Sequence, residues 1–304
     1  MHFSAYNFNF KSNIDLTDLS IFDTLLPKHD SQNAEAIEII FKKEDKGKYK
    51  QYIEQQTENS DDYAFYNDEN YAFFEILNGK QIIINYFNKI DSELIQSMLN
   101  YPVACLAAQK KYLCLHSSAI ELNGKVYLFP GKTHDGKSSI AASLISKGAK
   151  LITEDICIID FKNNYPFIRP SYHGLKISNE IIDRFNCFQN KQIIFTERKN
   201  KRSLIKIDDN DMIKQQRAVD FLIFPEWNEK LKGHNFRSLK ISEGFIKILG
   251  ANLFLPKDQK QKEFLFRANM NLANRVKSFI YERNKNLDLL KNLNLIEEFN
   301  GKVP

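Results

Sequence analysis

Short apolar runs with alternating or β-branched residues dominate the first 90 residues and predict strands. These runs are Ala36–Lys42, Tyr71–Leu77 and Gln81–Phe87, the last two joined by an Asn78-Gly79 turn of the kind that closes β-hairpins. A polar, acidic stretch over Glu44–Asp62 separates the first run from the others. The pattern predicts a small β-rich accessory domain over residues 1–90.

From residue 91 onward, helical and strand periodicities alternate, which is typical of an α/β fold. Helices are expected over Asp91–Lys111 (despite Pro102), Asn179–Phe185, Lys262–Tyr281 and Leu287–Phe299. Strands are expected at Tyr112–Ile120, Lys125–Pro130, Lys150–Asp160, Leu204–Ile207 and Phe221–Phe224, with a strand and exposed loop at Gln189–Asn200. We therefore expect an α/β catalytic domain over residues 91–304.

One stretch of this second part carries a phosphate-binding motif. Gly131–Ser138 reads G-K-T-H-D-G-K-S, which matches G-x-x-x-x-G-K-[ST] and lies between the strand Lys125–Pro130 and a helix beginning at Lys137. The two glycines let backbone N–H groups turn toward a polyphosphate, and the helix N-terminus adds partial positive charge. Lys137 would neutralise charge at the β- and γ-phosphates, and Ser138 would offer its hydroxyl to Mg²⁺. The predicted nucleotide contacts are Gly131, Lys132, Thr133, His134, Asp135, Gly136, Lys137, Ser138 and Ser139. An ordinary Gly-Lys surface turn is the alternative.

Two carboxylates, Glu154 and Asp155, interrupt the apolar strand that follows the loop helix. Buried charge is costly there unless a cation or partner compensates it. A Mg²⁺ ion held by Ser138 and Asp155 would be such a cation. The alternative is a strand end where both carboxylates meet solvent or form an ion pair. His116 lies beside another apolar run, a position more often taken by a core histidine than by a functional one.

The run from Leu115 to Ile156 resembles the catalytic core of HPr kinase/phosphorylase and of the HPr-kinase-like serine kinases, some of which phosphorylate the precursors of peptide natural products such as lasso peptides. The spacing from His116 to the loop, and from the loop to the acidic pair, matches that core without a gap. The resemblance implies a P-loop kinase domain of the HPr kinase/PEP carboxykinase-like type. It implies catalytic roles for Glu154, Asp155, His116 and Lys137. Weaker similarity extends to Tyr6–Leu19, Arg169–Ile177 and Lys201–Ser203.

Three positions depart from that family's pattern. Lys132 and Ser139 stand where the family has acidic residues, and Glu154 stands where it has aspartate. The extra methylene of glutamate moves its carboxylate by about an ångström, which affects the geometry of proton abstraction. The resemblance therefore implies phosphotransfer but argues against the phosphorylase activity and against HPr as the substrate.

The resulting hypothesis is an ATP-dependent kinase that phosphorylates a serine, or another hydroxyl, on a peptide or protein acceptor. ATP and Mg²⁺ are the expected cofactors. Glu154 would accept the hydroxyl proton, Asp155 would orient Mg²⁺ or its water, and His116 would contact the phosphoryl group or hold the carboxylate. Arg169, Lys201 and Arg202 are further candidates for phosphate contacts, although for each of them a solvated basic turn is the more common arrangement. A nucleotide hydrolase, a PEP-carboxykinase-like enzyme and a non-catalytic nucleotide-sensing module remain alternative functions.

The composition indicates a folded protein and bears on the state of its cysteines and on its location. A chain of 304 residues with 43% hydrophobic and 12% aromatic content predicts a folded protein with a sizeable core. Four cysteines without C-x-x-C spacing predict buried reduced thiols rather than zinc ligands or disulfides. We find no apolar run of about 18 residues and no signal-peptide pattern, so no membrane partner and a cytoplasmic location are expected.

Charge is distributed unevenly along the chain. Residues 1–100 carry 9 Lys and no Arg against 17 acidic residues, net −8, whereas the remainder is net +13. A positive C-terminal two-thirds suits a polyanionic nucleotide or an acidic peptide. It would also suit nucleic acid, but no basic-aromatic cluster or known nucleic-acid module is present. The identity of the acceptor and the oligomeric state, a homo-oligomer included, stay open.

Overall fold

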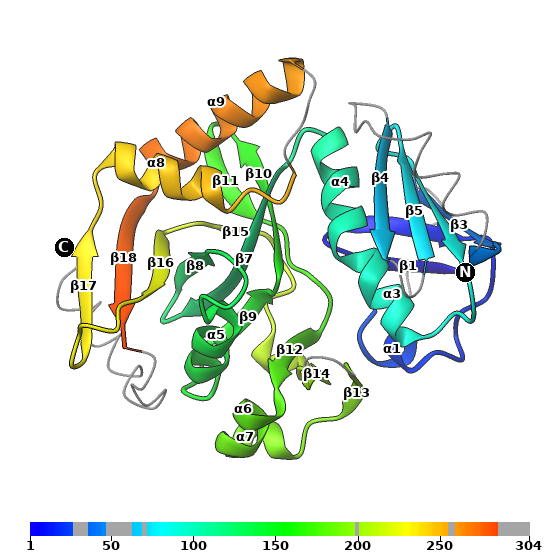
Figure 1. The fold of residues 1–304 in the computed structure, drawn as a ribbon, viewed down its shortest axis with the longest axis horizontal. Helices are drawn as coiled ribbons and strands as arrows, with labels where there is room; N and C mark the ends of the chain where they lie inside the picture. Colours follow the sequence, from blue (N-terminus) through cyan, green and yellow to red (C-terminus); the bar gives the residue numbers. More distant parts are fainter. Residues whose placement is uncertain (27–35, 47–62, 69–71, 198–200, 255–258, 285–304) are drawn as a thin grey trace.

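The computed structural model describes residues 1–26, 36–46, 63–68, 72–197, 201–254 and 259–284. Within these ranges the chain forms three β-sheets with helices packed against them, a mixed α/β architecture (Figure 1). No helix in the described ranges combines the length and apolar character needed to span a bilayer.

The first sheet has the strand order β1-β2-β3-β6-β5-β4. Its strands are β1 (His2–Ala5), β2 (Phe8–Ser12), β3 (Ile37–Lys43), β4 (Tyr63–Asp68), β5 (Ala72–Leu77) and β6 (Gln81–Tyr86). The three strands expected in this region are therefore confirmed as β3, β5 and β6, except that Tyr71 and most of the acidic stretch Glu44–Asp62 lie outside the described residues. Tyr6 and Asn7 join β1 to β2 in a tight turn in which both residues have positive φ, 54° and 55°.

Two helices, not one, cover residues 91–111. The chain forms α3 (Ser92–Leu99) and α4 (Tyr101–Gln109), separated by Asn100 with φ −89° and ψ −119°. The prediction of a single helix was wrong. Pro102 has no backbone N–H to donate to a preceding helical turn, so it is tolerated only in the first turn of a new helix. Both helices share one apolar core with the first sheet and with the short helix α1 (Ser20–Thr24). In Figure 1 they stand between this sheet and strand β7 (Leu113–Leu122), and the expected domain boundary near residue 90 stays a prediction.

The second sheet has the order β15-β11-β10-β7-β8-β16-β18-β17, with β9 paired to β7. The further strands are β8 (Lys125–Pro130), β9 (Lys150–Thr153), β10 (Ile156–Lys162), β11 (Tyr165–Ile168), β15 (Arg217–Ala218), β16 (Phe221–Trp227), β17 (His234–Ser238) and β18 (Lys277–Arg283). Strands β8, β16 and β18 run parallel. Helix α5 (Lys137–Ile145) lies on one face of this sheet, and α8 (Ile241–Gly250) and α9 (Gln259–Arg275) lie on the other (Figure 1).

Two elements of this sheet differ from the prediction. The expected strand Lys150–Asp160 is two strands, β9 and β10, because Glu154 and Asp155 break it. The expected helix Lys262–Tyr281 ends at Arg275, and the chain continues as strand β18. The spacing of apolar residues in this segment fits both a helix and a strand. Pairing with β16 in the buried sheet favours the strand. Helix α8 was not predicted, and the expected helix Leu287–Phe299 lies outside the described residues.

A small third sheet carries two side chains that matter below. It consists of β12 (Gly174–Ser178), β14 (Arg202–Lys206) and β13 (Ile193–Thr196), flanked by α6 (Asn179–Arg184), α7 (Asn186–Gln189) and the 3-10 turn η1 (Asp209–Asp211). Helix α6 and the strand at 204–207 are confirmed, with the strand starting two residues earlier than expected. All four cysteines are free thiols; three are buried, but Cys187 is exposed at the surface of α7, contrary to expectation.

Arg169, next to β11, ties the N-terminal hairpin to the second sheet. Its Nε donates to the Tyr6 carbonyl at 2.8 Å and its Nη2 donates to the Asn7 carbonyl at 2.6 Å. The guanidinium group lies over the rings of Phe8 and Tyr112, 4.2 and 4.6 Å from their centroids. Arg169 is buried, so its charge is compensated by these carbonyls and rings rather than by water.

Replacing Arg169 with methionine should lower the free energy of unfolding. The variant loses two charge-assisted hydrogen bonds and leaves two turn carbonyls without a donor, a cost of about 2–4 kcal/mol. Urea unfolding measures the difference. Arg237→Met is the matched control, because Arg237 forms an exposed 3.3 Å ion pair with Glu243, and such a pair is worth less than about 1 kcal/mol. Equal stability of the two variants would contradict the role given to Arg169.

Candidate functional site

The phosphate-binding motif forms a tight loop between β8 and α5. Gly131 N–H donates to the His116 carbonyl at 3.1 Å, which anchors the start of the loop to β7. The Asp135 carboxylate folds back and accepts the Lys132 N–H at 2.6 Å. Gly136 takes the N-cap position of α5 with φ 79°, a left-handed conformation that glycine adopts without strain. The loop, strand and helix thus follow in the predicted order.

One aromatic and one cationic side chain hold this loop by hydrogen bonds to its backbone carbonyl groups. Trp227 Nε1, at the end of β16, donates to the His134 carbonyl at 2.8 Å. Arg283, at the end of β18, is 1% exposed and donates from Nη2 to the Asp135 carbonyl at 3.0 Å. Its guanidinium group lies 4.2 Å from the centre of the Trp227 ring, and burial lowers the pKa of Arg283 to about 10. A Cβ atom at Gly136 would lie 1.9 Å from Arg283 Nη2, so only glycine fits there.

Lys137 keeps its ammonium group at the loop. The side chain is buried, and its Nζ donates to the Lys132 carbonyl at 2.7 Å. Burial lowers the pKa of Lys137, while the carboxylates of Asp155 and Glu154 act in the opposite direction. The acidic pair is therefore close enough to influence this lysine electrostatically.

Glu154 lies directly beneath the first turn of α5. Its Oε1 accepts a hydrogen bond from Ser138 Oγ at 2.6 Å and lies 3.7 Å from Arg202 Nη2. The carboxylate is 4% exposed. Burial and the neighbouring Asp155 charge raise the pKa of Glu154, and Arg202 and Ser138 only partly oppose this shift.

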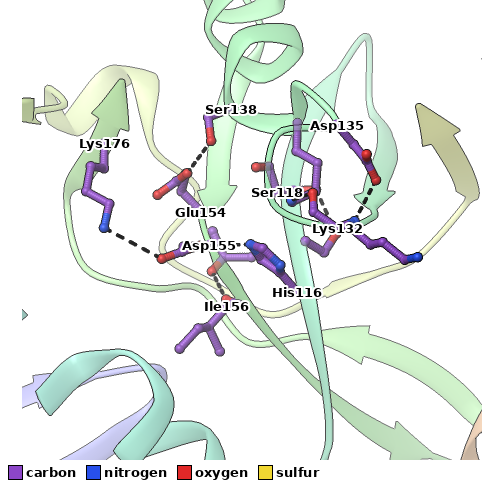
Figure 2. A network of polar contacts seen from close by, with 12 residues as sticks. His116, Ser118, Lys132, Asp135, Ser138, Glu154, Asp155, Ile156 and Lys176 are labelled. Atoms are coloured by element: carbon purple, nitrogen blue, oxygen red, sulfur yellow. Dashed lines mark hydrogen bonds and ion pairs between the residues drawn. The ribbon is translucent and has the colours of Figure 1, made fainter. Parts of the chain in front are cut away.

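Figure 2 shows Asp155 next to Glu154, with its carboxylate between the side chains of Lys176 and His116. His116 Nε2 lies 3.1 Å from its Oδ1, and Lys176 Nζ lies 3.9 Å from its Oδ2. Burial alone would raise the pKa of this carboxyl group, but the His116 hydrogen bond and the Lys176 charge hold the pKa below its ordinary value. The backbone of Asp155 has φ 68°, a left-handed conformation that is uncommon outside glycine and is found at functional sites.

The third sheet supplies two cations to this group. Arg202 Nη2 donates to Ser138 Oγ at 3.2 Å and to the Lys176 carbonyl at 2.6 Å. Lys176, itself buried, also forms an ion pair with Glu197 at 3.1 Å. Each cation therefore links a carboxylate of the acidic pair to the third sheet.

A cavity of about 710 Å³ opens between these elements, within the size range of ligand sites. Predicted site residues that line it are His116, Thr133, His134, Gly136, Lys137, Ser138, Ser139 and Asp155. Gly131, Lys132, Asp135 and Glu154 lie outside the lining, in the loop itself or beneath Ser138. The structure thus brings the predicted loop, histidine and acidic pair together.

Several residues of this site had no or little signal in the sequence. Trp227, Asn100 and Tyr101 line the cavity and Arg283 supports the loop, although none of them belongs to a local motif. Lys176 also lines the cavity and lies within the weakly similar segment Arg169–Ile177, but it was not singled out from the sequence. Arg202 lines the cavity, whereas Arg169 is used at the hairpin and is absent from the lining. Lys201, beside Arg202, is also absent from the lining.

Ser138 and Glu154 supply the two donor atoms that could hold a metal ion next to the loop. Within the described ranges, no three His, Cys, Asp or Glu side chains gather in a geometry that could hold a metal ion. Mg²⁺ bound with a nucleotide needs only one or two protein ligands, since phosphate oxygens and water complete its octahedron. A hydroxyl and a carboxylate oxygen 2.6 Å apart, Ser138 Oγ and Glu154 Oε1, form such a pair.

The chain was compared with protein families, curated sequences and solved structures. No protein-family model matches the chain, and no curated protein matches its sequence. Among solved structures, the chain is similar to the HPr(Ser) kinase/phosphatase from Coxiella burnetii, with 14% sequence identity and a TM-score of 0.32. The match covers 62% of this chain and 98% of that chain. Similarity at this level of identity and TM-score does not assign an activity to this chain.

Gly136→Ala should destabilise the protein more than Gly124→Ala. Both glycines have positive φ, 79° and 73°, so alanine costs about 1–2 kcal/mol of backbone strain at either position. Only at Gly136 does the new Cβ meet Arg283, which adds about 1–3 kcal/mol of overpacking, whereas nothing lies within 4 Å of a Cβ at Gly124. Urea unfolding of both variants tests this difference. Equal losses would mean that Arg283 does not brace the loop.

Proposed function

We propose that this protein is a kinase with a P-loop kinase fold of the HPr kinase/PEP carboxykinase-like type, and that it transfers the γ-phosphoryl group of ATP to a hydroxyl group, such as a serine side chain, of a peptide or protein. The observation that carries the proposal is the meeting of the loop and the acidic pair, joined by the 2.6 Å hydrogen bond from Ser138 to Glu154. A glycine loop alone would suit many anions. A glycine loop with a lysine, a serine and two carboxylates on one cavity suits a metal-bound polyphosphate and the activation of an attacking group.

The cations of the cavity are placed to hold the polyphosphate. Lys137 comes from the loop side, and Lys176 and Arg202 come from the third sheet. The N-terminus of α5 adds its partial positive charge from the loop side. Together these groups would stabilise charge that develops on the phosphate oxygens during transfer.

Ser138 and Glu154 would hold Mg²⁺, with Asp155 as the other carboxylate within reach of the loop. When bound, the ion supplies positive charge to the β- and γ-phosphate oxygens. Ser138 is suited to this role because its hydroxyl already lies between Glu154 and Arg202.

Asp155 is the better placed of the two carboxylates to accept the proton of an incoming hydroxyl. It lines the cavity, whereas Glu154 lies under Ser138. Geometry comes before pKa in choosing a base, and in a loose phosphoryl-transfer transition state the hydroxyl proton leaves late, so a weak base suffices. We therefore assign proton acceptance to Asp155 and the metal-side position to Glu154, the reverse of the assignment made from the sequence.

The proposed transfer conserves atoms and electrons. The acceptor oxygen forms a bond to the γ-phosphorus while the bond from that phosphorus to the β,γ-bridging oxygen breaks. ADP leaves with that electron pair, and the hydroxyl proton passes to the Asp155 carboxylate. His116, 3.1 Å from Asp155, holds this carboxylate in position.

Lys137→Ala should lower ATP turnover by about two orders of magnitude or more, because it removes a buried charge from the transferring group. Turnover is measured as ADP release with Mg²⁺. Nucleotide affinity is followed by fluorescence of Trp227, the single tryptophan of the chain, which lines the cavity. Lys147→Ala, at an exposed lysine just past the end of α5, is the control. Retained turnover in Lys137→Ala would reject the loop as a phosphate site.

The same assay separates the rival functions. ADP release at one rate with and without protein acceptors would indicate a hydrolase. Tight nucleotide binding without any turnover would indicate a sensing module.

Asp155→Asn and Glu154→Gln should differ in their kinetics. Asp155→Asn should lower kcat by about 10²–10⁴-fold with little change in affinity for Mg-ATP. Glu154→Gln should mainly raise the Mg²⁺ concentration needed for half-maximal rate, by about tenfold, since it weakens a metal ligand. Asp160→Asn, in β10 just after the acidic pair but outside the cavity lining, is the control. The opposite pattern would return proton acceptance to Glu154.

A further inference from the structure

The loop lies between the acidic pair on one side and an aromatic side chain on the other. Strands β9, β8, β16 and β18 all end at the same edge of the second sheet, because β8 and β9 both run antiparallel to β7, and β16 and β18 run parallel with β8. The acidic pair follows β9, the loop follows β8, and Trp227 and Arg283 end β16 and β18. In the order of the strands, the loop therefore separates Trp227 from the acidic pair.

The proposed transfer fixes the direction in which a nucleotide lies across the loop. Asp155, the proposed proton acceptor, lies with His116 and Lys176 on one side of the loop residues Lys132 and Asp135 (Figure 2). The γ-phosphoryl group has to lie on that side to reach a hydroxyl activated by Asp155. The nucleoside is at the other end of the triphosphate and would therefore lie toward Trp227, which lines the same cavity.

The Trp227 ring has surface that a ligand in the cavity can reach. The Arg283 guanidinium group lies 4.2 Å from the centre of the ring, and Arg283 is itself buried, so this side of the ring is closed to a ligand. Trp227 is nonetheless only half-buried, and it lines the cavity. The accessible surface of the ring therefore lies away from Arg283 and toward the cavity.

This ring is held in place without a ligand. Trp227 Nε1 donates to the His134 carbonyl at 2.8 Å, and the Arg283 guanidinium group supports one side of the ring. A side chain that is already ordered loses little conformational freedom when a ligand packs on it. An aromatic ring can stack on any base, because every base has a π-face. A fixed aromatic ring beside a phosphate-binding loop thus suits a planar nucleobase.

We propose that Trp227 is the nucleobase platform of this site, on which the base of the bound nucleotide stacks on the side of the ring away from Arg283. The proposal rests on the kinase function proposed above and adds the residue that holds the nucleoside. Lys137 and the loop would then bind the phosphates, while Trp227 would distinguish a nucleoside triphosphate from an inorganic polyphosphate.

The first test compares two ligands of the full-length wild-type chain, each with Mg²⁺: an ATP analogue with a non-hydrolysable β,γ-bridge, and inorganic tripolyphosphate. Calorimetry should give a Kd for the ATP analogue that is lower by about tenfold or more, the gain from one stacked base. Trp227 is the single tryptophan, so tryptophan fluorescence reports on this position alone. The ATP analogue should quench this fluorescence, because a stacked base quenches indole emission, and tripolyphosphate should leave it nearly unchanged.

Two substitutions separate stacking from support of the loop. Trp227→Phe keeps an aromatic ring without the hydrogen bond to His134, and Trp227→Leu removes both. Weaker support of the loop should affect both ligands alike, so it leaves the ratio of their Kd values unchanged. The ratio should stay at about fivefold or more in Trp227→Phe and fall below about twofold in Trp227→Leu. Phe266→Leu, at an exposed phenylalanine of α9 outside the cavity lining, should keep the wild-type ratio.

The outcomes distinguish failure of the platform from failure of the proposed function. A wild-type Kd ratio near one, equal quenching by both ligands, or a ratio that Trp227→Leu leaves unchanged would overturn the platform while leaving the kinase function intact. In the last case the base would bind another part of the cavity. If neither ligand binds the wild-type chain, the loop is not a phosphate site, and both the kinase function and the platform are rejected.

Discussion

The structure around the cavity depends on the compensation of two adjacent carboxylates, that of Glu154, which is buried, and that of Asp155, which is half-buried. Glu154 and Asp155 are adjacent in the chain, and in a regular strand adjacent side chains point to opposite faces of the sheet. The left-handed conformation of Asp155, with φ 68°, breaks the strand between β9 and β10 and frees both side chains from that alternation. Glu154 can then meet Ser138 while Asp155 meets His116, and both contacts border one cavity. Aspartate tolerates this conformation better than most residues, so the strain stays small.

The same compensation joins parts of the chain that are far apart in sequence. Lys176 and Arg202 from the third sheet are drawn to the acidic pair, because a carboxylate removed from water needs a cation or donors nearby. From the other side, the turn of the N-terminal hairpin places the Tyr6 ring in the same buried layer. Burial raises the pKa of Tyr6, and the charges of Tyr172, Asp155 and Glu154 raise it further. Arg169 holds the carbonyl of this tyrosine, so the hairpin turn is fixed to the second sheet near the acidic pair.

Local sequence patterns were sufficient to predict the part of the site that is continuous in the chain. The glycine loop, its strand and its helix could be predicted, because a loop between two regular elements is defined by nearby residues. The break at Asp155 could not be predicted, since hydrophobic periodicity does not reveal a single left-handed residue. The strand β18 was taken for the end of a helix because its apolar spacing fits both states and only the neighbouring β16 decides between them. Trp227 and Arg283 reach the site through tertiary packing, for which a single sequence gives no local signal.

The charges around the cavity constrain how a polyphosphate could bind there. Lys176 pairs with Asp155 and Glu197, and Arg202 lies 3.7 Å from Glu154, so both cations of the third sheet already face carboxylates. A metal-free polyphosphate would have to compete with those carboxylates for the same cations and would leave them uncompensated. Under the proposed function, Glu154 and Asp155 would be compensated by a divalent ion that is bound together with the phosphates. Binding of nucleotide and binding of Mg²⁺ are therefore expected to be coupled through Glu154 and Asp155, because neither ligand alone preserves the charge balance of the cavity.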